Sequence, residues 1–127
     1  MKQAKRRMDE PADKQYLIII NDAPYGSERP YNALRLALAL TKRSARVRMF
    51  LMADAVYCAI DGQKPPTGYY SIERMLRSVA RRGEVATCGT CQEARGIEAE
   101  RFVDGVRVGS MDLLGEWTLE ADQVINF

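Results

Sequence analysis

Short hydrophobic runs alternate along the chain with longer segments of helical periodicity. The run at 16–20 is continuous and rich in β-branched residues, which is typical of a strand buried on both faces. The segment 46–53 alternates between polar and apolar residues before it becomes wholly apolar, and it predicts a second strand that enters the core. Shorter runs at 84–87 and 123–127 predict two further strands.

Segments with helical spacing lie between these strands. Their boundaries carry recognisable signals, since Pro30 suits a first helical turn, and Ser71 and Ser110 are good N-cap residues. Apolar spacing, caps and glycine stops predict helices at 27–42, 54–60, 72–82, 88–95 and 110–122. The stretch 63–68 contains Pro-Pro and Gly and predicts a loop, and Asp104-Gly105 predicts a turn.

Strands that alternate with helices long enough to cross over predict a mainly parallel sheet. We expect a three-layer α/β/α sandwich with about five strands, formed by a single domain at 15–127 that follows a flexible tail at 1–14. In such sheets the functional crevice lies beyond the carboxyl ends of the strands. Because Asp22, Asp54 and Cys88 each follow a predicted strand, we expect them at one edge of the sheet.

The overall charge and hydropathy narrow the class of protein. The formal net charge is only +2, and the basic residues form no stripe that would bind nucleic acid. The tyrosines, which could stack on bases, come from separate segments and are expected at the edge of the core or at a subunit interface. The apolar runs are far shorter than the roughly 20 residues that span a bilayer. The charged segment 1–14 has no apolar region behind it, so it does not resemble a secretory signal. We therefore expect a cytoplasmic protein that binds no nucleic acid and has no membrane span.

The chain contains no histidine, which excludes Ser-His-Asp and Cys-His catalysis within one chain. It also excludes every metal site that needs an imidazole. A structural zinc site needs four ligands, and Cys58 is the only thiol besides Cys88 and Cys91. The loop at 23–27 has neither of the glycine patterns that cradle phosphates. We expect no metal and no bound cofactor.

The most informative short motif is Cys-Gly-Thr-Cys, which joins the predicted strand at 84–87 to a short helix. A helix N-terminus offers unpaired N–H groups and a partial positive charge, which favour the reactive thiolate at Cys88. If the thiols bridge, Cys88 is expected to attack and Cys91 to resolve. The alternative is that both are inert buried side chains. Cys58 is expected to be packing, and Asp54 either caps a helix or tunes Cys88.

The segment Thr87-Cys-Gly-Thr-Cys-Gln-Glu-Ala-Arg-Gly-Ile97 resembles the DsrE/DsrF-like family, which includes YchN-like proteins and TusD-related sulfur-relay subunits. In these proteins a strand-end cysteine leads to Arg-Gly and a hydrophobic residue. The similarity extends over about 16–127. Weaker matches support it at 21–28, 53–56, 68–72 and 120–127.

The resemblance implies a function for Cys88. In the sulfur-relay members the strand-end cysteine accepts a sulfane sulfur as a persulfide and passes it to a partner, and Cys88 matches that position by its spacing to Gly96. This chain departs from the pattern at Cys91, where those subunits have a small apolar residue. The resemblance also implies a homotrimer or homohexamer, with sulfur donor or acceptor proteins as partners.

These observations lead to one leading hypothesis and two alternatives. The leading hypothesis is a DsrE-like sulfur carrier or sulfurtransferase that uses a Cys88 persulfide in intracellular sulfur relay, with Cys91 as a resolving or modulating thiol. The first alternative is a thiol-disulfide or redox-sensing module that uses the Cys88/Cys91 pair. The second is an oligomeric binding protein whose cysteines do no chemistry.

Overall fold

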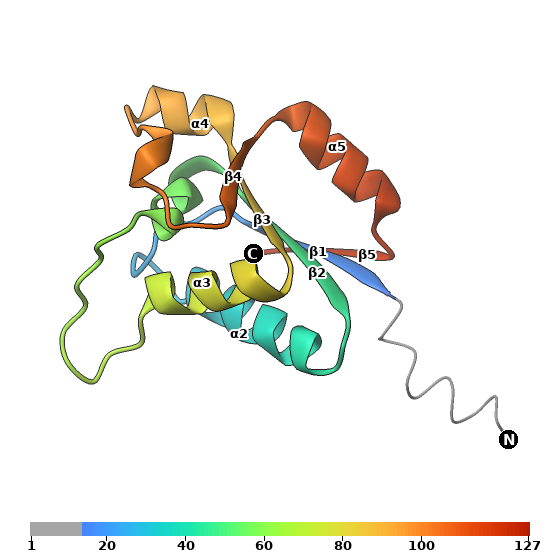
Figure 1. The fold of residues 1–127 in the computed structure, drawn as a ribbon, viewed down its shortest axis with the longest axis horizontal. Helices are drawn as coiled ribbons and strands as arrows, with labels where there is room; N and C mark the ends of the chain where they lie inside the picture. Colours follow the sequence, from blue (N-terminus) through green and yellow to red (C-terminus); the bar gives the residue numbers. More distant parts are fainter. Residues whose placement is uncertain (1–13) are drawn as a thin grey trace, which may run out of the picture.

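The computed structural model describes residues 14–127, and its centre is a five-stranded sheet in the order β4-β3-β2-β1-β5 (Figure 1). The strands are β1 (Gln15–Ile20), β2 (Arg46–Leu51), β3 (Glu84–Cys88), β4 (Val106–Gly109) and β5 (Gln123–Asn126). All neighbouring strands are parallel, as the sequence predicts. The tail predicted at 1–14 lies outside the described residues apart from Lys14.

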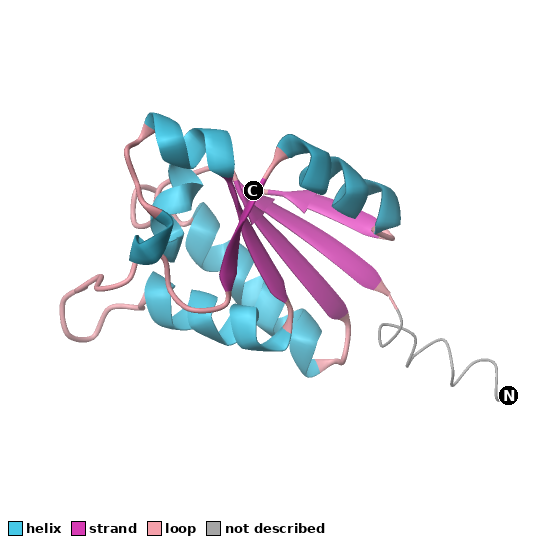
Figure 2. Ribbon diagram, turned by 45° about the horizontal axis from the view of Figure 1, so that its top comes forward, coloured by secondary structure: helices cyan, strands magenta, loops and turns pink. Residues whose placement is uncertain are grey.

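Helices connect the strands and cover the sheet on both faces (Figure 2). The α-helices are α2 (Arg29–Lys42), α3 (Ile72–Arg82), α4 (Gly89–Ala94) and α5 (Met111–Glu120), and the 3₁₀ helices are η2 (Ala53–Ala59) and η3 (Ala99–Arg101). The chain moves across the sheet in one direction from β1 to β4, and then returns past β1 to β5. Right-handed crossovers therefore place α2 and α3 on one face and α5 on the other, which confirms the three-layer sandwich. No helix within residues 14–127 is long and apolar enough to cross a membrane.

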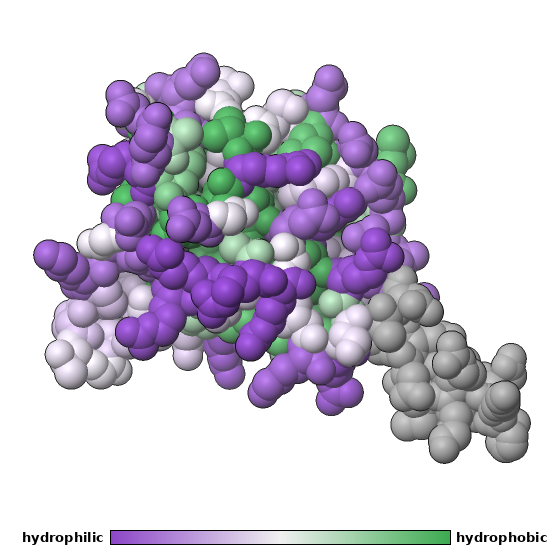
Figure 3. Space-filling model, viewed as in Figure 1, coloured by the Kyte–Doolittle hydropathy of each residue, from purple (hydrophilic) through white to green (hydrophobic). Residues whose placement is uncertain are grey.

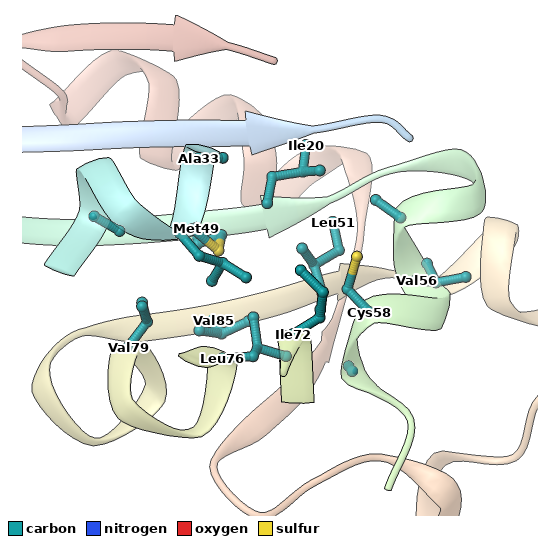
Figure 4. Close-up of a cluster of buried hydrophobic side chains, with 14 of the residues drawn as sticks. Ile20, Ala33, Met49, Leu51, Val56, Cys58, Ile72, Leu76, Val79 and Val85 are labelled. Atoms are coloured by element: carbon teal, nitrogen blue, oxygen red, sulfur yellow. The ribbon is translucent and has the colours of Figure 1, made fainter. Parts of the chain in front are cut away.

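The larger part of the core lies between the sheet and the pair α2 and α3. Alternate residues of the strands point to this face and are fully buried, and Figure 4 shows several of them against side chains from both helices. The members from the strands are Ile18, Ile20, Val47, Met49, Leu51 and Val85, and those from the two helices are Ala33, Leu34, Ala37, Ile72, Leu76 and Val79. Strands buried on both faces carry such continuous apolar runs.

The opposite face of the sheet packs against α5 through one large aromatic residue. Trp117 is 1% exposed, and the edge of its ring meets Phe50 with the ring centroids 6.2 Å apart. The guanidinium groups of Arg48 and Arg107 lie 5.1 and 5.4 Å from the Trp117 ring, within the range of a cation–π contact. Cys88 belongs to this cluster. The reactive-thiol candidate is therefore on the α5 side of the sheet.

The structure differs from the sequence prediction mainly in β4. The sequence predicts only a turn at Asp104-Gly105, whereas residues 106–109 form the edge strand beside β3. This strand has four residues and its Val108 is 48% exposed, so it lacks the buried apolar run that marks the other strands. The predicted caps are present: Ser71 accepts a hydrogen bond from the Arg74 N–H, and Ser110 accepts one from the Leu113 N–H.

Candidate functional site

The carboxyl ends of three neighbouring strands meet at one edge of the sheet. Ile20 at the end of β1 pairs with Leu51 at the end of β2, and Leu51 pairs with Thr87 in β3. The next residue, Cys88, is both the last residue of β3 and the N-cap of α4. Its pairing partner across the sheet is Gly109 in β4. The structure therefore confirms that Cys88 stands at the edge where α/β sheets carry their functional crevice.

The backbone around Cys88 is closely packed. Its Sγ accepts a hydrogen bond from the Cys91 N–H at 3.3 Å, and the residue is 7% exposed. A Cβ on Gly89 would lie 2.8 Å from the carbonyl oxygen of Gly109, so only glycine lets α4 begin this close to β4. Val108 keeps 48% of its surface exposed, and Figure 3 shows hydrophobic side chains at the surface over β4 and beside α4 and α5. The thiol thus lies close to an apolar surface.

Burial raises the pKa of the Cys88 thiol, and the adjacent Cys91 side chain raises it further. The N–H groups of Cys91 and Thr90 act in the opposite direction but do not outweigh these effects. The net direction is opposite to the one expected from a helix N-terminus. The physical reason is that α4 has six residues, too few for a strong macrodipole, while the thiol has lost most of its contact with water.

Cys91 provides a second thiol next to the first. Its side chain is half-buried, and its Sγ accepts a hydrogen bond from the Ala53 N–H at 3.2 Å. Ala53 has φ +52°, a left-handed conformation that is uncommon for a residue other than glycine. Both cysteines are in the free thiol form. Within residues 14–127 no group of three or more Cys, Asp and Glu side chains is arranged to hold a metal ion.

Asp54 lies in the first turn of η2, where Met52 occupies the N-cap position, so Asp54 does not cap the helix. Its Oδ1 accepts hydrogen bonds at 2.9 Å from Nε of Arg95, and the Nη2 atom of the same guanidinium is also 2.9 Å away. Arg95 follows α4, and its Nη1 donates to the Cys91 carbonyl oxygen at 3.0 Å. The structure therefore brings Asp54 to the helix that carries Cys91, through an arginine rather than by contact with Cys88.

Cys58 is a core residue, as the sequence predicts. Its side chain has no exposed surface and lies among apolar side chains from several elements (Figure 4). Its Sγ donates a weak hydrogen bond to the carbonyl oxygen of Asp22 at 3.9 Å. Burial, with a smaller contribution from the Asp22 charge, raises the pKa of Cys58 to about 12. We therefore expect this thiol to be unreactive at neutral pH, so its modification can be compared with that of Cys88 and Cys91.

Sequence reasoning missed Arg95 and the Ala53 N–H as parts of the site. Arg95 had a usable signal, because it stands four residues after Cys91, at the end of the helix predicted at 88–95, where it lies over the preceding turn. Its partner Asp54 is 41 residues away in the chain, and this pairing is set by how η2 packs against α4. Nothing in the local sequence marks Ala53 for a positive φ.

Known proteins with similar sequences and structures agree with this architecture. Protein YchN of Escherichia coli is 44% identical over 117 residues, which cover 90% of this chain and 99% of YchN. Protein MK0008 of Methanopyrus kandleri is 38% identical over 110 residues, or 87% of this chain and 91% of that protein. The crystal structure of the E. coli ychN protein has a TM-score of 0.84 over 90% of this chain and 99% of that chain, again at 44% identity.

A more distant structure supports the fold alone. The protein of unknown function MTH1491 from Methanobacterium thermoautotrophicum has a TM-score of 0.73 at 13% identity, over 91% of this chain and 100% of that chain. The family described as DsrE/DsrF-like matches residues 14–127, which is the whole of the described chain. With this match and the identity to YchN, the chain belongs to the DsrE/DsrF-like family.

Proposed function

We propose that this protein accepts a sulfane sulfur on Cys88, holds it as a persulfide and passes it to an acceptor thiol. The observation that carries the proposal is the position of Cys88 Sγ at the carboxyl edge of the sheet, on a backbone N–H and beside a second thiol. Family membership supports it, because the sulfur-relay members use the strand-end cysteine in this way. The expected partners are proteins or small molecules that donate and accept sulfane sulfur, and the expected assembly is a homotrimer or homohexamer.

The transfer needs no outside oxidant. In loading, the Cys88 thiolate attacks the outer sulfur of a donor persulfide, the donor sulfur–sulfur bond breaks, and the donor leaves as a thiolate. In delivery, an acceptor thiolate attacks the outer sulfur on Cys88, the new sulfur–sulfur bond forms on the acceptor, and Cys88 leaves as a thiolate. Each step exchanges one sulfur–sulfur bond for another, so the oxidation level of the transferred sulfur is conserved.

The burial of Cys88 has two consequences for this reaction. The raised pKa keeps most of the empty thiol protonated at neutral pH, so only a small thiolate fraction is available to attack a donor. A sulfur–sulfur bond is about 2 Å long, so the outer sulfur of a persulfide stands that much further out than Sγ. In delivery, an acceptor thiolate must therefore reach this outer sulfur, and not Sγ itself.

The proposal is tested by loading the wild-type protein with inorganic polysulfide, removing the excess and mapping persulfides by alkylation and peptide mass spectrometry. The added sulfur is expected on the peptide that contains Cys88, and Cys58 is expected to remain unmodified while the protein is folded. Cys88→Ser is expected to abolish loading, while Cys91→Ala retains it. A Cys88 that stays unmodified in folded, polysulfide-treated protein would contradict the proposal.

One observation favours a second function, thiol-disulfide exchange. The Cys91 N–H donates to Cys88 Sγ at 3.3 Å, the Cys91 side chain raises the pKa of Cys88, and the two residues are the ends of a Cys-x-x-Cys segment. Incubation in glutathione buffers of graded redox potential, followed by thiol trapping, measures the stability of a Cys88–Cys91 disulfide. A disulfide in equilibrium with glutathione supports this function. A pair that stays fully reduced in the folded protein at every buffer ratio excludes it.

A further inference from the structure

Cys91 is held by two contacts, one from the segment that follows β2 and one from the arginine that follows α4. Its Sγ accepts the Ala53 N–H at 3.2 Å, and its carbonyl oxygen accepts Nη1 of Arg95 at 3.0 Å. The same guanidinium binds Asp54, the residue after Ala53, at 2.9 Å. These contacts form a closed ring in which Asp54 and Arg95 connect the donor of the sulfur hydrogen bond to the helix that carries the sulfur.

The ring matters because of what a free Cys91 does to a loaded Cys88. A Cys91 thiolate attacks the inner sulfur of the Cys88 persulfide, a Cys88–Cys91 disulfide forms, and hydrosulfide leaves with the electron pair of the broken bond. This side reaction discharges the cargo without an acceptor. A disulfide needs its two sulfurs about 2 Å apart, so the Cys91 sulfur must move toward Cys88 from the position in which it accepts the Ala53 N–H.

The backbone conformation of Ala53 supports the idea that this contact is imposed by the fold. A non-glycine residue at φ +52° is in a sparsely populated conformation that the surroundings must impose. In this conformation the Ala53 N–H donates to the Cys91 sulfur at 3.2 Å. The ion pair of the next residue with Arg95 anchors this turn to α4, 41 residues further along the chain.

We propose that Asp54 and Arg95 are positioning residues that hold the Cys91 sulfur on the Ala53 N–H and thereby slow its attack on a Cys88 persulfide. This inference rests on the proposed function of Cys88. The pair acts on the fate of the bound sulfur, and not on its loading. An intact ring favours delivery to an acceptor, and a broken ring favours release of sulfide.

The experiment follows sulfide released from polysulfide-loaded protein in the absence of an acceptor, and in parallel the Cys88 persulfide by mass spectrometry. Asp54→Asn and Arg95→Gln are each expected to accelerate release about two- to fivefold, the range that a partly exposed ion pair supports. The double variant is expected to match either single variant, because both break the same contact. In a Cys91→Ala background the substitutions are expected to change nothing.

The chain offers a matched control in Asp61, whose carboxylate lies 2.9 Å from an arginine, Arg77, and is 61% exposed, against 59% for Asp54. Asp61→Asn makes the same chemical change away from the thiols and is expected to leave the release rate unaltered. A salt titration adds a second readout. Added salt screens a partly exposed pair, so it is expected to accelerate release in the wild type but not in Asp54→Asn.

The outcomes separate the two proposals. Normal loading of Cys88, with an unchanged release rate in Asp54→Asn and Arg95→Gln, would overturn the positioning role and leave the carrier function standing. Equal acceleration by Asp61→Asn would overturn it as well, since the effect would then be one of general charge. Failure of wild-type Cys88 to load at all would overturn the carrier function and this inference with it.

Discussion

Replacing the buried thiol of Cys58 is expected to change the pH dependence of stability in a calculable way. Burial raises the pKa of this thiol from its ordinary value of 9.0 to about 12 in the folded chain. Above pH 9 the unfolded chain loses the Cys58 proton while the folded chain keeps it, so the unfolded state gains stability. The contribution of the neutral thiol is thus complete below pH 9 and is lost as the pH rises toward 12.

The magnitude follows from the two pKa values. Between pH 8 and pH 10 this group alone lowers the free energy of unfolding of the wild type by about 1 kcal/mol. Cys58→Ala lacks this loss, but it carries the usual cost of a truncated core side chain, about 1 kcal/mol. The variant is therefore expected to be less stable than the wild type at pH 8. Near pH 10 the two proteins are expected to have nearly equal stability.

The assay is urea unfolding at pH 8 and pH 10 under reducing conditions, followed by the fluorescence of Trp117, the only tryptophan in the chain. Val56→Ala is the matched control, because Val56 is fully buried on the same 3₁₀ helix and has no titratable group. Its stability difference from the wild type is expected to be equal at both pH values. A Cys58→Ala difference that is also independent of pH would refute the reasoning.

Three further predictions concern helix α3 and its two ends. Gly83→Ala places a Cβ in steric clash with the carbonyl oxygen of Val47, so we expect a loss of about 2–3 kcal/mol in urea unfolding, and wild-type stability would contradict this packing. Ser71→Ala removes the N-cap acceptor of α3 and is expected to cost about 1 kcal/mol, whereas Ser71→Asp should retain most of the stability. Burial opposes the ionisation of Glu73, but hydrogen bonds from Arg77 and from the backbone outweigh it and lower the Glu73 pKa. Its stabilising effect is therefore present above the ordinary glutamate pKa and lost as the pH falls below it, and Glu73→Gln is expected to flatten the acid limb of an unfolding profile; an unchanged acid limb would contradict this.

The sequence predicts most of the helices and strands, because the central strands are buried apolar runs and two of the helices begin with recognisable cap residues. The run at 16–20 and the Ser71 cap are local signals, and both elements form where these signals place them. The position of Cys88 follows from the same pattern. A cysteine between a buried strand and a helix lies at the carboxyl end of that strand, and therefore at the edge of the sheet. The edge strand β4 gives no such signal, because it is short and largely exposed.

The electrostatics of the site were not predictable from the motif. Cys88 at a helix start predicts a lowered pKa, but the outcome depends on helix length and on how far the fold removes the thiol from water. Burial is the larger effect here, and it raises the pKa. The contacts of Cys91 with Ala53 and of Asp54 with Arg95 likewise join segments 38 and 41 residues apart. Contacts of this kind follow from tertiary packing and have no local pattern.

The carrier function is tested most directly with variants that retain a single thiol. Cys58→Ala/Cys91→Ala leaves only Cys88, and Cys58→Ala/Cys88→Ala leaves only Cys91. After treatment of both folded proteins with polysulfide and removal of the excess, intact-protein mass spectrometry counts the added sulfur. The Cys88-only protein is expected to gain one sulfur atom and to lose it to an added small-molecule thiol, while the Cys91-only protein gains none. Addition of sulfur to the Cys91-only protein, while the Cys88-only protein stays unmodified, would contradict the carrier function of Cys88.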